Sequence, residues 1–150
     1  MGFYIMSTRF AWLSGLALVC SMLVVGASAA SATVVARVDL STQTMKVSVN
    51  GRRAHTWRVS TGRGRYRTPV GHYRPYYLKR RHYSRKYRGA PMPYSIFFRG
   101  GYAVHGTNHI RALGRRASHG CIRLHPAHAA RLYSLVRRHG KKNTRIIIGY

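Results

Sequence analysis

The residue types that can do chemistry are concentrated in one short segment, "SHGCIRL", residues 118–124. In this segment Cys121 lies two residues after His119 and two residues before Arg123. A thiol attacks a carbonyl carbon effectively as its thiolate, so a catalytic cysteine needs a nearby base or positive surroundings. The segment therefore suggests a cysteine nucleophile, with a metal ligand or a small buried side chain as the alternatives.

Two histidines are candidates for the base. His119 would point to the same side as Cys121 if their segment is extended, because side chains alternate along a strand. His105 ends a predicted strand, "YAVH", residues 102–105, and reaches Cys121 only if the fold brings the two together. The residue types alone do not choose between these histidines.

Other groups that assist a catalytic cysteine are also present. Gly120 permits a tight bend whose N–H groups could converge on a developing oxyanion. Arg123 can attract a substrate carboxylate, although a solvated arginine is the simpler interpretation. The chain has a single acidic residue, Asp39, so we expect a backbone carbonyl or a neutral side chain to orient the catalytic histidine.

The same scarcity of carboxylates excludes two classes of enzyme. Glycoside hydrolases need a pair of Asp or Glu side chains, and the usual general base of a zinc hydrolase would be missing. Side chains of the types that can bind zinc are present, but their spacing matches no common zinc pattern. These side chains are His105, His109, His119 and Cys121. We therefore expect no metal, and we expect His109 to be a polar surface residue.

The chain is also strongly basic, with 27 Lys and Arg residues, one acid and a formal charge of +26 over 150 residues. This length has room for one domain. Such a charge must repel itself or meet an anionic partner, so a basic protein that binds nucleic acid or another polyanion is an alternative function. Because the cations are scattered and form no recognised nucleic-acid module, we expect no nucleic acid as partner.

The N-terminus predicts export. Arg9 precedes an apolar run, residues 11–26, and small residues follow at 27–32, which is typical of a cleaved signal peptide. We expect a signal peptide over residues 1–30, a single folded domain over residues 31–150, and a location in the periplasm or cell envelope. An uncleaved membrane anchor is the alternative.

The elements that position the cysteine segment begin with a β-meander. Residues 32–60 alternate apolar and polar side chains, as half-buried strands do, and the pair Asn50-Gly51 predicts a tight hairpin between two of them. Residues 60–75 are rich in Gly and Pro and predict loops. Residues 76–98 mix tyrosines with cations, which predicts either a solvated basic loop or a binding surface for an extended ligand, before the strand-like "YSIFF".

One helix is predicted, directly after the cysteine segment, at residues 126–140. Pro126 suits its first turn and Gly140 its C-terminal cap, and an apolar stripe at helical spacing predicts a face packed on the core. Residues 144–149 predict a last buried strand. The fold class is mainly β, with one main α-helix after the cysteine motif.

The histidine and cysteine segments together resemble the signature of a known family. "HGT" at residues 105–107, ten intervening residues and then "SHGCIRL" are similar to the motif of the YkuD family of L,D-transpeptidases. The similarity covers about residues 34–149, and this family's catalytic domain is a β-sandwich-like mixed sheet. Further similar segments are residues 38–47, 59–71 and 90–98.

The resemblance implies a role for each site residue. Cys121 would be the nucleophile, and His105 would accept and donate the proton while the carbonyl of Gly106 orients its imidazole. The cysteine turn would line the oxyanion hole, through His119, Gly120 and Cys121. Ser118 and Arg123 would support or contact the donor substrate.

The resemblance also implies acyl transfer on peptidoglycan stem peptides in cell-wall biogenesis. A cysteine acyl-enzyme would form at the third stem residue, and an incoming amine would resolve it as a 3→3 cross-link. If water resolved it, the protein would be an L,D-carboxypeptidase; if a protein amine did, it would attach envelope proteins to peptidoglycan. No metal or organic cofactor is implied. Arginines within "GRGRY", residues 62–66, leave the substrate preference open.

Overall fold

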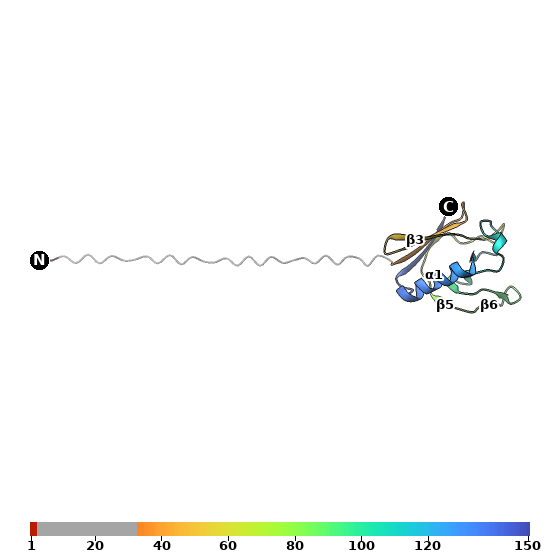
Figure 1. Ribbon diagram of the computed structural model, residues 1–150. Helices are drawn as coiled ribbons and strands as arrows, with labels where there is room; N and C mark the ends of the chain where they lie inside the picture. Colours follow the sequence, from red (N-terminus) through yellow and green to blue (C-terminus); the bar gives the residue numbers. More distant parts are fainter. Residues whose placement is uncertain (3–32) are drawn as a thin grey trace.

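The computed structural model of the protein describes residues 1–2 and 33–150 (Figure 1). The predicted signal peptide, residues 1–30, therefore lies outside the described residues except for its first two. Within the described part of the chain, no helix is both long enough and apolar enough to span a bilayer. Residues 33–150 fold into two mixed β-sheets, a short hairpin and one main α-helix.

The first sheet has five strands in the order β3-β2-β1-β11-β4. β1 and β11 run parallel although they come from opposite ends of the folded region, and the other neighbours are antiparallel. The alternating sequence of β1 gives it one buried face. The strands are β1 (Val34–Asp39), β2 (Thr44–Val49), β3 (Arg52–Arg58), β4 (Gly71–Tyr73) and β11 (Thr144–Gly149).

The second sheet has four strands in the order β10-β9-β8-β5. β9 and β10 are parallel, whereas β8 is antiparallel to both of its neighbours. β6 and β7 follow β5 and precede β8 along the chain. They pair with each other and form the β6–β7 hairpin (residues 82–92). The strands are β5 (Tyr77–Lys79), β6 (Tyr83–Ser84), β7 (Ala90–Pro91), β8 (Ser95–Arg99), β9 (Tyr102–Gly106) and β10 (Ile122–Leu124).

The helix α1 (Pro126–His139) begins and ends where the sequence predicts. Pro126 occupies its first turn, and Gly140, with a φ of 88°, ends it while donating its N–H to the Val136 carbonyl at 2.9 Å. The predicted apolar stripe is buried and consists of Ala129, Leu132, Tyr133 and Val136. The prediction of this helix is confirmed.

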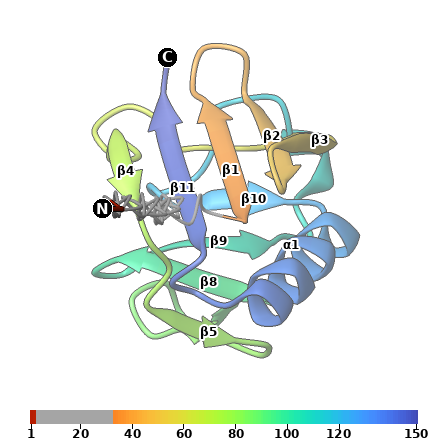
Figure 2. The same cartoon turned by 90° about the vertical axis from the view of Figure 1, so that its left-hand side faces the viewer.

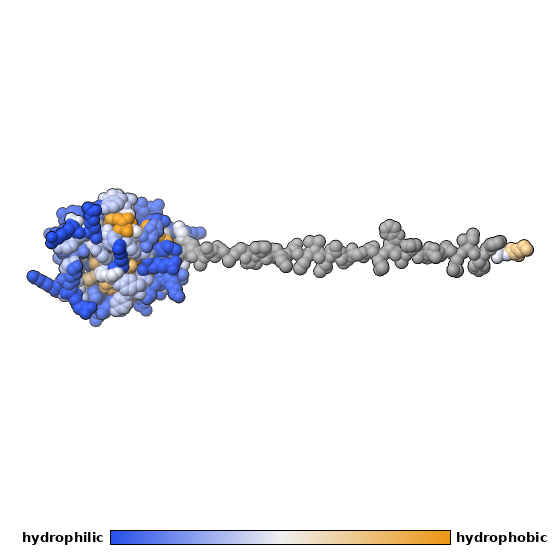
Figure 3. All heavy atoms as spheres, turned by 180° about the vertical axis from the view of Figure 1, so that it is seen from behind, coloured by the Kyte–Doolittle hydropathy of each residue, from blue (hydrophilic) through white to orange (hydrophobic). Residues whose placement is uncertain are grey.

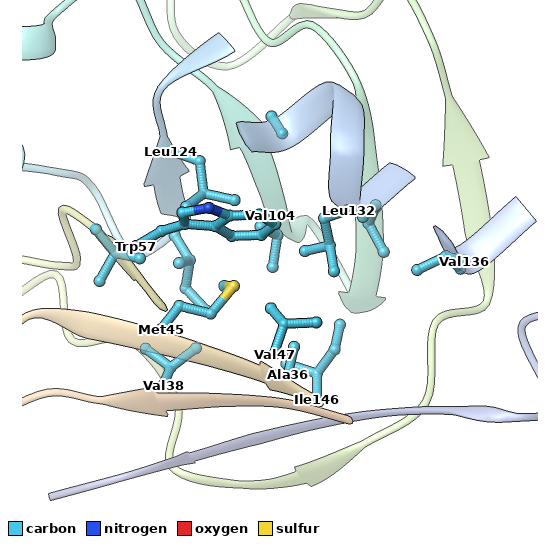
Figure 4. Close-up of a cluster of buried hydrophobic side chains, with 14 of the residues drawn as sticks. Ala36, Val38, Met45, Val47, Trp57, Val104, Leu124, Leu132, Val136 and Ile146 are labelled. Carbon is cyan, nitrogen blue, oxygen red and sulfur yellow. The ribbon is translucent and has the colours of Figure 1, made fainter. Parts of the chain in front are cut away.

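A hydrophobic core joins the two sheets and the helix. Figure 2 shows the strands of the first sheet above those of the second, with α1 beside them. Figure 4 shows side chains from all three layers meeting in the core, among them Met45 and Trp57 from the first sheet, Leu124 from the second and Leu132 from the helix. Burial of apolar surface, at about 25 cal/mol per Å², is the main force that holds β9 and β10 in place.

The predicted class, mainly β with one main helix, is confirmed, as is the hairpin at Asn50 and Gly51, whose φ values of 51° and 77° suit a tight turn. Two local expectations were wrong. The predicted loop at residues 60–75 contains the short strand β4, because residues 71–73 pair with β11 despite the glycines and prolines around them. Residues 76–98 do not form a single loop, because β5, β6 and β7 precede the predicted strand β8.

Candidate active site

Two parallel strands bring the histidine and cysteine segments together. In the register of β9 and β10, Val104 lies opposite Ile122 and His105 lies opposite Arg123. Val104 and Ile122 are fully buried in the core between the sheets. Because side chains alternate along a strand, His105 and Arg123 lie on the other face of the second sheet. Cys121, which lies two residues before Arg123, lines the same pocket.

The pocket on this face has a volume of about 630 Å³. The β6–β7 hairpin (residues 82–92) lines one side of it, and residues 105–109 and the cysteine segment line another. The predicted site residues that line it are His105, Ser118, His119, Cys121 and Arg123. Of the two interpretations of residues 76–98, this placement favours the binding surface over the solvated loop.

The imidazole of His105 is held by the backbone of its own strand. Its Nδ1 lies 2.7 Å from the carbonyl oxygen of Gly106. A carbonyl oxygen only accepts hydrogen bonds, so Nδ1 carries the proton and donates it. In the neutral ring Nε2 then has a free lone pair, which makes Nε2 the atom that can take a proton from a thiol.

Burial sets the protonation state of this histidine. His105 is only 5% exposed, and this burial lowers its pKa to about 4, against a smaller opposing effect of the hydrogen bond to Gly106. The positive charge of Arg123 lowers the pKa further. A lowered pKa means that the ring is neutral at pH values well above about 4 and becomes charged only as the pH falls through that value.

The thiol of Cys121 is also neutral at rest. Burial raises its pKa, and the backbone N–H of Ala103 and the charge of Arg123 only partly oppose this effect. The Sγ–H donates weakly to the Gly101 carbonyl at 3.8 Å, and within residues 33–150 it makes no hydrogen bond with His105. The lowered pKa of His105 and the raised pKa of Cys121 both favour the neutral forms, so the thiol must turn toward Nε2 to give up its proton.

The turn before the cysteine is built around the hydroxyl of Ser118. This side chain is fully buried; it donates to the carbonyl of Cys121 at 2.6 Å and accepts from the N–H of Gly120 at 3.0 Å. Ser118 thus holds the turn, and of the two roles implied for it, support fits better than contact with the donor. Gly120 has a φ of 110°, so the segment is not extended and the strand argument for His119 does not apply.

The hydrogen bonds of the turn limit which N–H groups can bind an oxyanion. The N–H of Gly120 already donates to Ser118, so it is not directed at a substrate in this structure. Within residues 33–150, no hydrogen bond engages the backbone N–H of His119 or Cys121. Of the three groups that the resemblance implies, these two are the available donors.

Three residues that sequence reasoning did not single out hold the turn from outside. Thr68 donates its hydroxyl to the carbonyl of Gly120 at 2.8 Å. The carbonyl of Thr61 accepts from the N–H of Ser118 at 2.9 Å. The buried side-chain amide of Gln43 in turn accepts from the backbone N–H of Thr61 and donates to the Thr61 hydroxyl. Their position in segments that resemble the family was the only available signal.

His119 is held between two aromatic rings and is not paired with the cysteine. Its ring stacks on Tyr87 of the β6–β7 hairpin at 4.7 Å and meets the edge of Tyr66 at 4.6 Å. It makes no hydrogen bond with Cys121 within the described residues. Neither histidine is hydrogen-bonded to the thiol, but the bond from Nδ1 to Gly106 leaves Nε2 of His105 available as a base, whereas the ring of His119 joins the cysteine turn to the pocket wall.

The remaining candidates lie at the edge of the pocket. Arg123 is about half-buried, and its guanidinium donates to the Ala117 carbonyl at 3.4 Å. His109 is exposed at the pocket rim, as expected for a polar surface residue. No three His, Cys, Asp or Glu side chains in residues 33–150 are grouped closely enough to hold a metal ion. The four side chains that the sequence offered as zinc ligands are therefore not grouped as a metal site in the described part of the chain.

This fold and signature can be compared with those of known proteins. A family model described as the L,D-transpeptidase catalytic domain, YkuD, matches residues 33–148. The chain belongs to the YkuD family. A Bacillus subtilis (strain 168) relative provisionally named L,D-transpeptidase YkuD is 28% identical over 103 residues, which are 66% of this chain and 58% of that protein.

Solved L,D-transpeptidases share the fold. One from Mycobacterium tuberculosis H37Rv is 26% identical with a TM-score of 0.69, and the match covers 79% of this chain and 58% of that chain. One from Xylanimonas cellulosilytica is 28% identical with a TM-score of 0.66, and the match covers 79% and 61%. The YkuD-family chain described here thus spans less than two thirds of the length of these relatives.

The cysteine turn predicts the effect of a Gly120→Ala substitution. A Cβ at this position would lie 2.5 Å from Cε1 of Tyr102, and the φ of 110° is strained for any residue with a Cβ. We expect a loss of about 2–4 kcal/mol in the free energy of unfolding, measured with chemical denaturant. The control is Gly64→Ala, where φ is 51° and no atom lies within 4 Å; it should lose about 1 kcal/mol. Equal losses would contradict this account of the turn.

Proposed function

We propose that this protein is a peptidoglycan L,D-transpeptidase that forms 3→3 cross-links between stem peptides through an acyl-enzyme on Cys121. The observation that carries the proposal is the register of β9 and β10, which sets His105 beside Arg123 on the face where Cys121 lines the pocket. Membership of the YkuD family supports the reaction class.

In the first half-reaction the cysteine is acylated. The Cys121 Sγ–H turns from Gly101 toward His105 and gives its proton to Nε2 as the sulfur attacks the carbonyl carbon of the third stem residue. The resulting oxyanion accepts hydrogen bonds from the N–H groups of Cys121 and His119; one such donor contributes about 10²–10³-fold in rate. Nε2–H then protonates the leaving amine as the tetrahedral intermediate collapses, so that the C–N bond breaks, the terminal D-alanine departs and the thioester on Cys121 remains.

In the second half-reaction an amine of another stem peptide attacks the thioester. His105 Nε2 accepts a proton from that amine and returns it to the sulfur of Cys121 when the tetrahedral intermediate collapses. The products are an amide cross-link and the free thiol, so protons and bonds balance over the cycle. The hydrogen bond from Nδ1 to Gly106 stabilises the imidazolium that forms twice in this cycle.

The location and partners of the enzyme are part of the same proposal. The signal-like N-terminus supports export to the periplasm or cell envelope, where stem peptides are found. The charge of +26 favours retention on the anionic cell wall.

The proposed nucleophile predicts the result of treatment with a carbapenem, a lactam class that the family resemblance expects to acylate Cys121. Intact-protein and peptide mass spectrometry should show one adduct, on the peptide that contains Cys121 and not on the one that contains Cys20. Cys121→Ala should carry no adduct. His105→Gln should react about 10²–10⁴-fold more slowly, because it lacks the base. An adduct of equal rate on Cys121→Ala would refute the assigned nucleophile.

The reaction itself is tested by mixing the full-length protein with tetrapeptide-rich peptidoglycan and analysing the muropeptides. We expect 3→3 cross-linked dimers and free D-alanine, and neither with Cys121→Ala. Tripeptides without dimers would identify an L,D-carboxypeptidase instead. Attachment of an added envelope protein without dimers would identify a protein-anchoring enzyme. Unchanged muropeptides combined with salt-sensitive polyanion binding would leave the binding-protein alternative.

A further inference from the structure

The side chains that line the pocket are charged with one sign only. Arg85 and Lys86 lie on the β6–β7 hairpin, and Arg123 lies on β10. No Asp or Glu is among the lining residues, and the one acid of the chain, Asp39, accepts its hydrogen bonds from Ser41 and Thr42 elsewhere. Hydrophilic side chains also cover most of the face shown in Figure 3. Charged residues are thus common on the surface, and a cation can contribute to ligand selection only if the fold fixes its position in the pocket.

A layered stack fixes one of these cations relative to the cysteine turn. The ammonium of Lys86 lies 5.6 Å from the centre of the Tyr87 ring, and that ring stacks on His119 at 4.7 Å. His119 also makes a T-shaped contact with Tyr66, and the guanidinium of Arg65 lies 5.2 Å from the centre of the Tyr66 ring. Cation–π contacts of this kind hold a charge in place at low cost in solvation. Cations on two different loops are therefore positioned around His119, which lies two residues before Cys121.

The histidines of the pocket respond to these charges. The pKa of His82 is lowered by burial and then by the charges of Lys79 and Arg85. The pKa of His119 is lowered by burial and then by Arg63, Arg123 and Lys86. Both effects have the sign of a positive electrostatic potential, which attracts anionic groups and repels cationic ones.

We propose that this pocket selects donor stem peptides by their free carboxylates, so that a donor whose third-residue side chain ends in a carboxylate is used in preference to the same donor with a carboxamide. The inference rests on the proposed function and names the donor class of the same site. Arg85 and Lys86 are the specificity-determining residues, and Arg123 contributes from β10.

The chemistry of the two donors accounts for the preference. A carboxylate accepts charge-assisted hydrogen bonds from guanidinium and ammonium groups, whereas a carboxamide has no net charge to attract them. Arg85 and Lys86 are exposed to solvent, and each exposed pair contributes up to about fivefold, so the two together provide about tenfold. A bound carboxylate also offsets the positive potential that disfavours the imidazolium of His105, which favours proton transfer from the thiol.

The test compares two disaccharide-tetrapeptide donors that differ only in a free or an amidated third-residue carboxylate. The full-length enzyme receives each donor with the same neutral amine acceptor, and kcat/KM is measured from the release of D-alanine. We expect about tenfold higher kcat/KM for the free acid. Added salt should reduce this ratio, because it screens partly exposed charges.

Two variants on the same hairpin complete the test. The double variant R85Q/K86Q, with its folding checked by thermal unfolding, should lower the ratio to about twofold or less. Arg88→Gln is the matched control, because Arg88 is an exposed cation of the same hairpin that does not line the pocket, and it should keep the wild-type ratio. A ratio near one in the wild type, or an unchanged ratio in R85Q/K86Q, overturns this inference alone. Failure of both donors to react refutes the proposed function and this inference with it.

Discussion

The hydrogen bond between His105 Nδ1 and the carbonyl of Gly106 is the interaction on which the rest of the site depends. It assigns the proton of the neutral ring to Nδ1 and leaves the lone pair on Nε2. Many thiol enzymes orient their histidine with a side chain, but here a peptide carbonyl takes that place, in a chain with a single carboxylate. The site can therefore work without a buried negative charge, whose desolvation would be costly.

The parallel pairing of β9 and β10 turns this local bond into a site. This pairing places Arg123 beside His105 and fixes the strand that directly follows Cys121. The same packing that excludes water keeps both reacting groups neutral at rest, since burial lowers the pKa of the histidine and raises that of the thiol. In the proposed mechanism, proton transfer is then coupled to attack on the substrate, and the proposed role of Arg85 and Lys86 links that step to the charge of the donor.

Much of the fold, and several of the residues that line the candidate pocket, could be predicted from local patterns. The hairpin at Asn50, the helix after Pro126 and the family signature are all short-range features. The network that holds the cysteine turn could not be predicted, because Gln43 reaches Thr61 across 18 residues and Thr68 reaches Gly120 across 52. The neutral forms that burial favours for His105 and Cys121 could not be predicted either, since this burial exists only once the sheets pack together.

The most direct test of this account is the ¹⁵N NMR spectrum of the imidazole of His105 in the uniformly labelled full-length protein, followed as the pH is lowered. The account predicts a proton on Nδ1, an unprotonated Nε2 at neutral pH, and protonation only as the pH approaches about 4. A neutral ring with its proton on Nε2, or an imidazolium at neutral pH paired with a Cys121 thiolate, would contradict it.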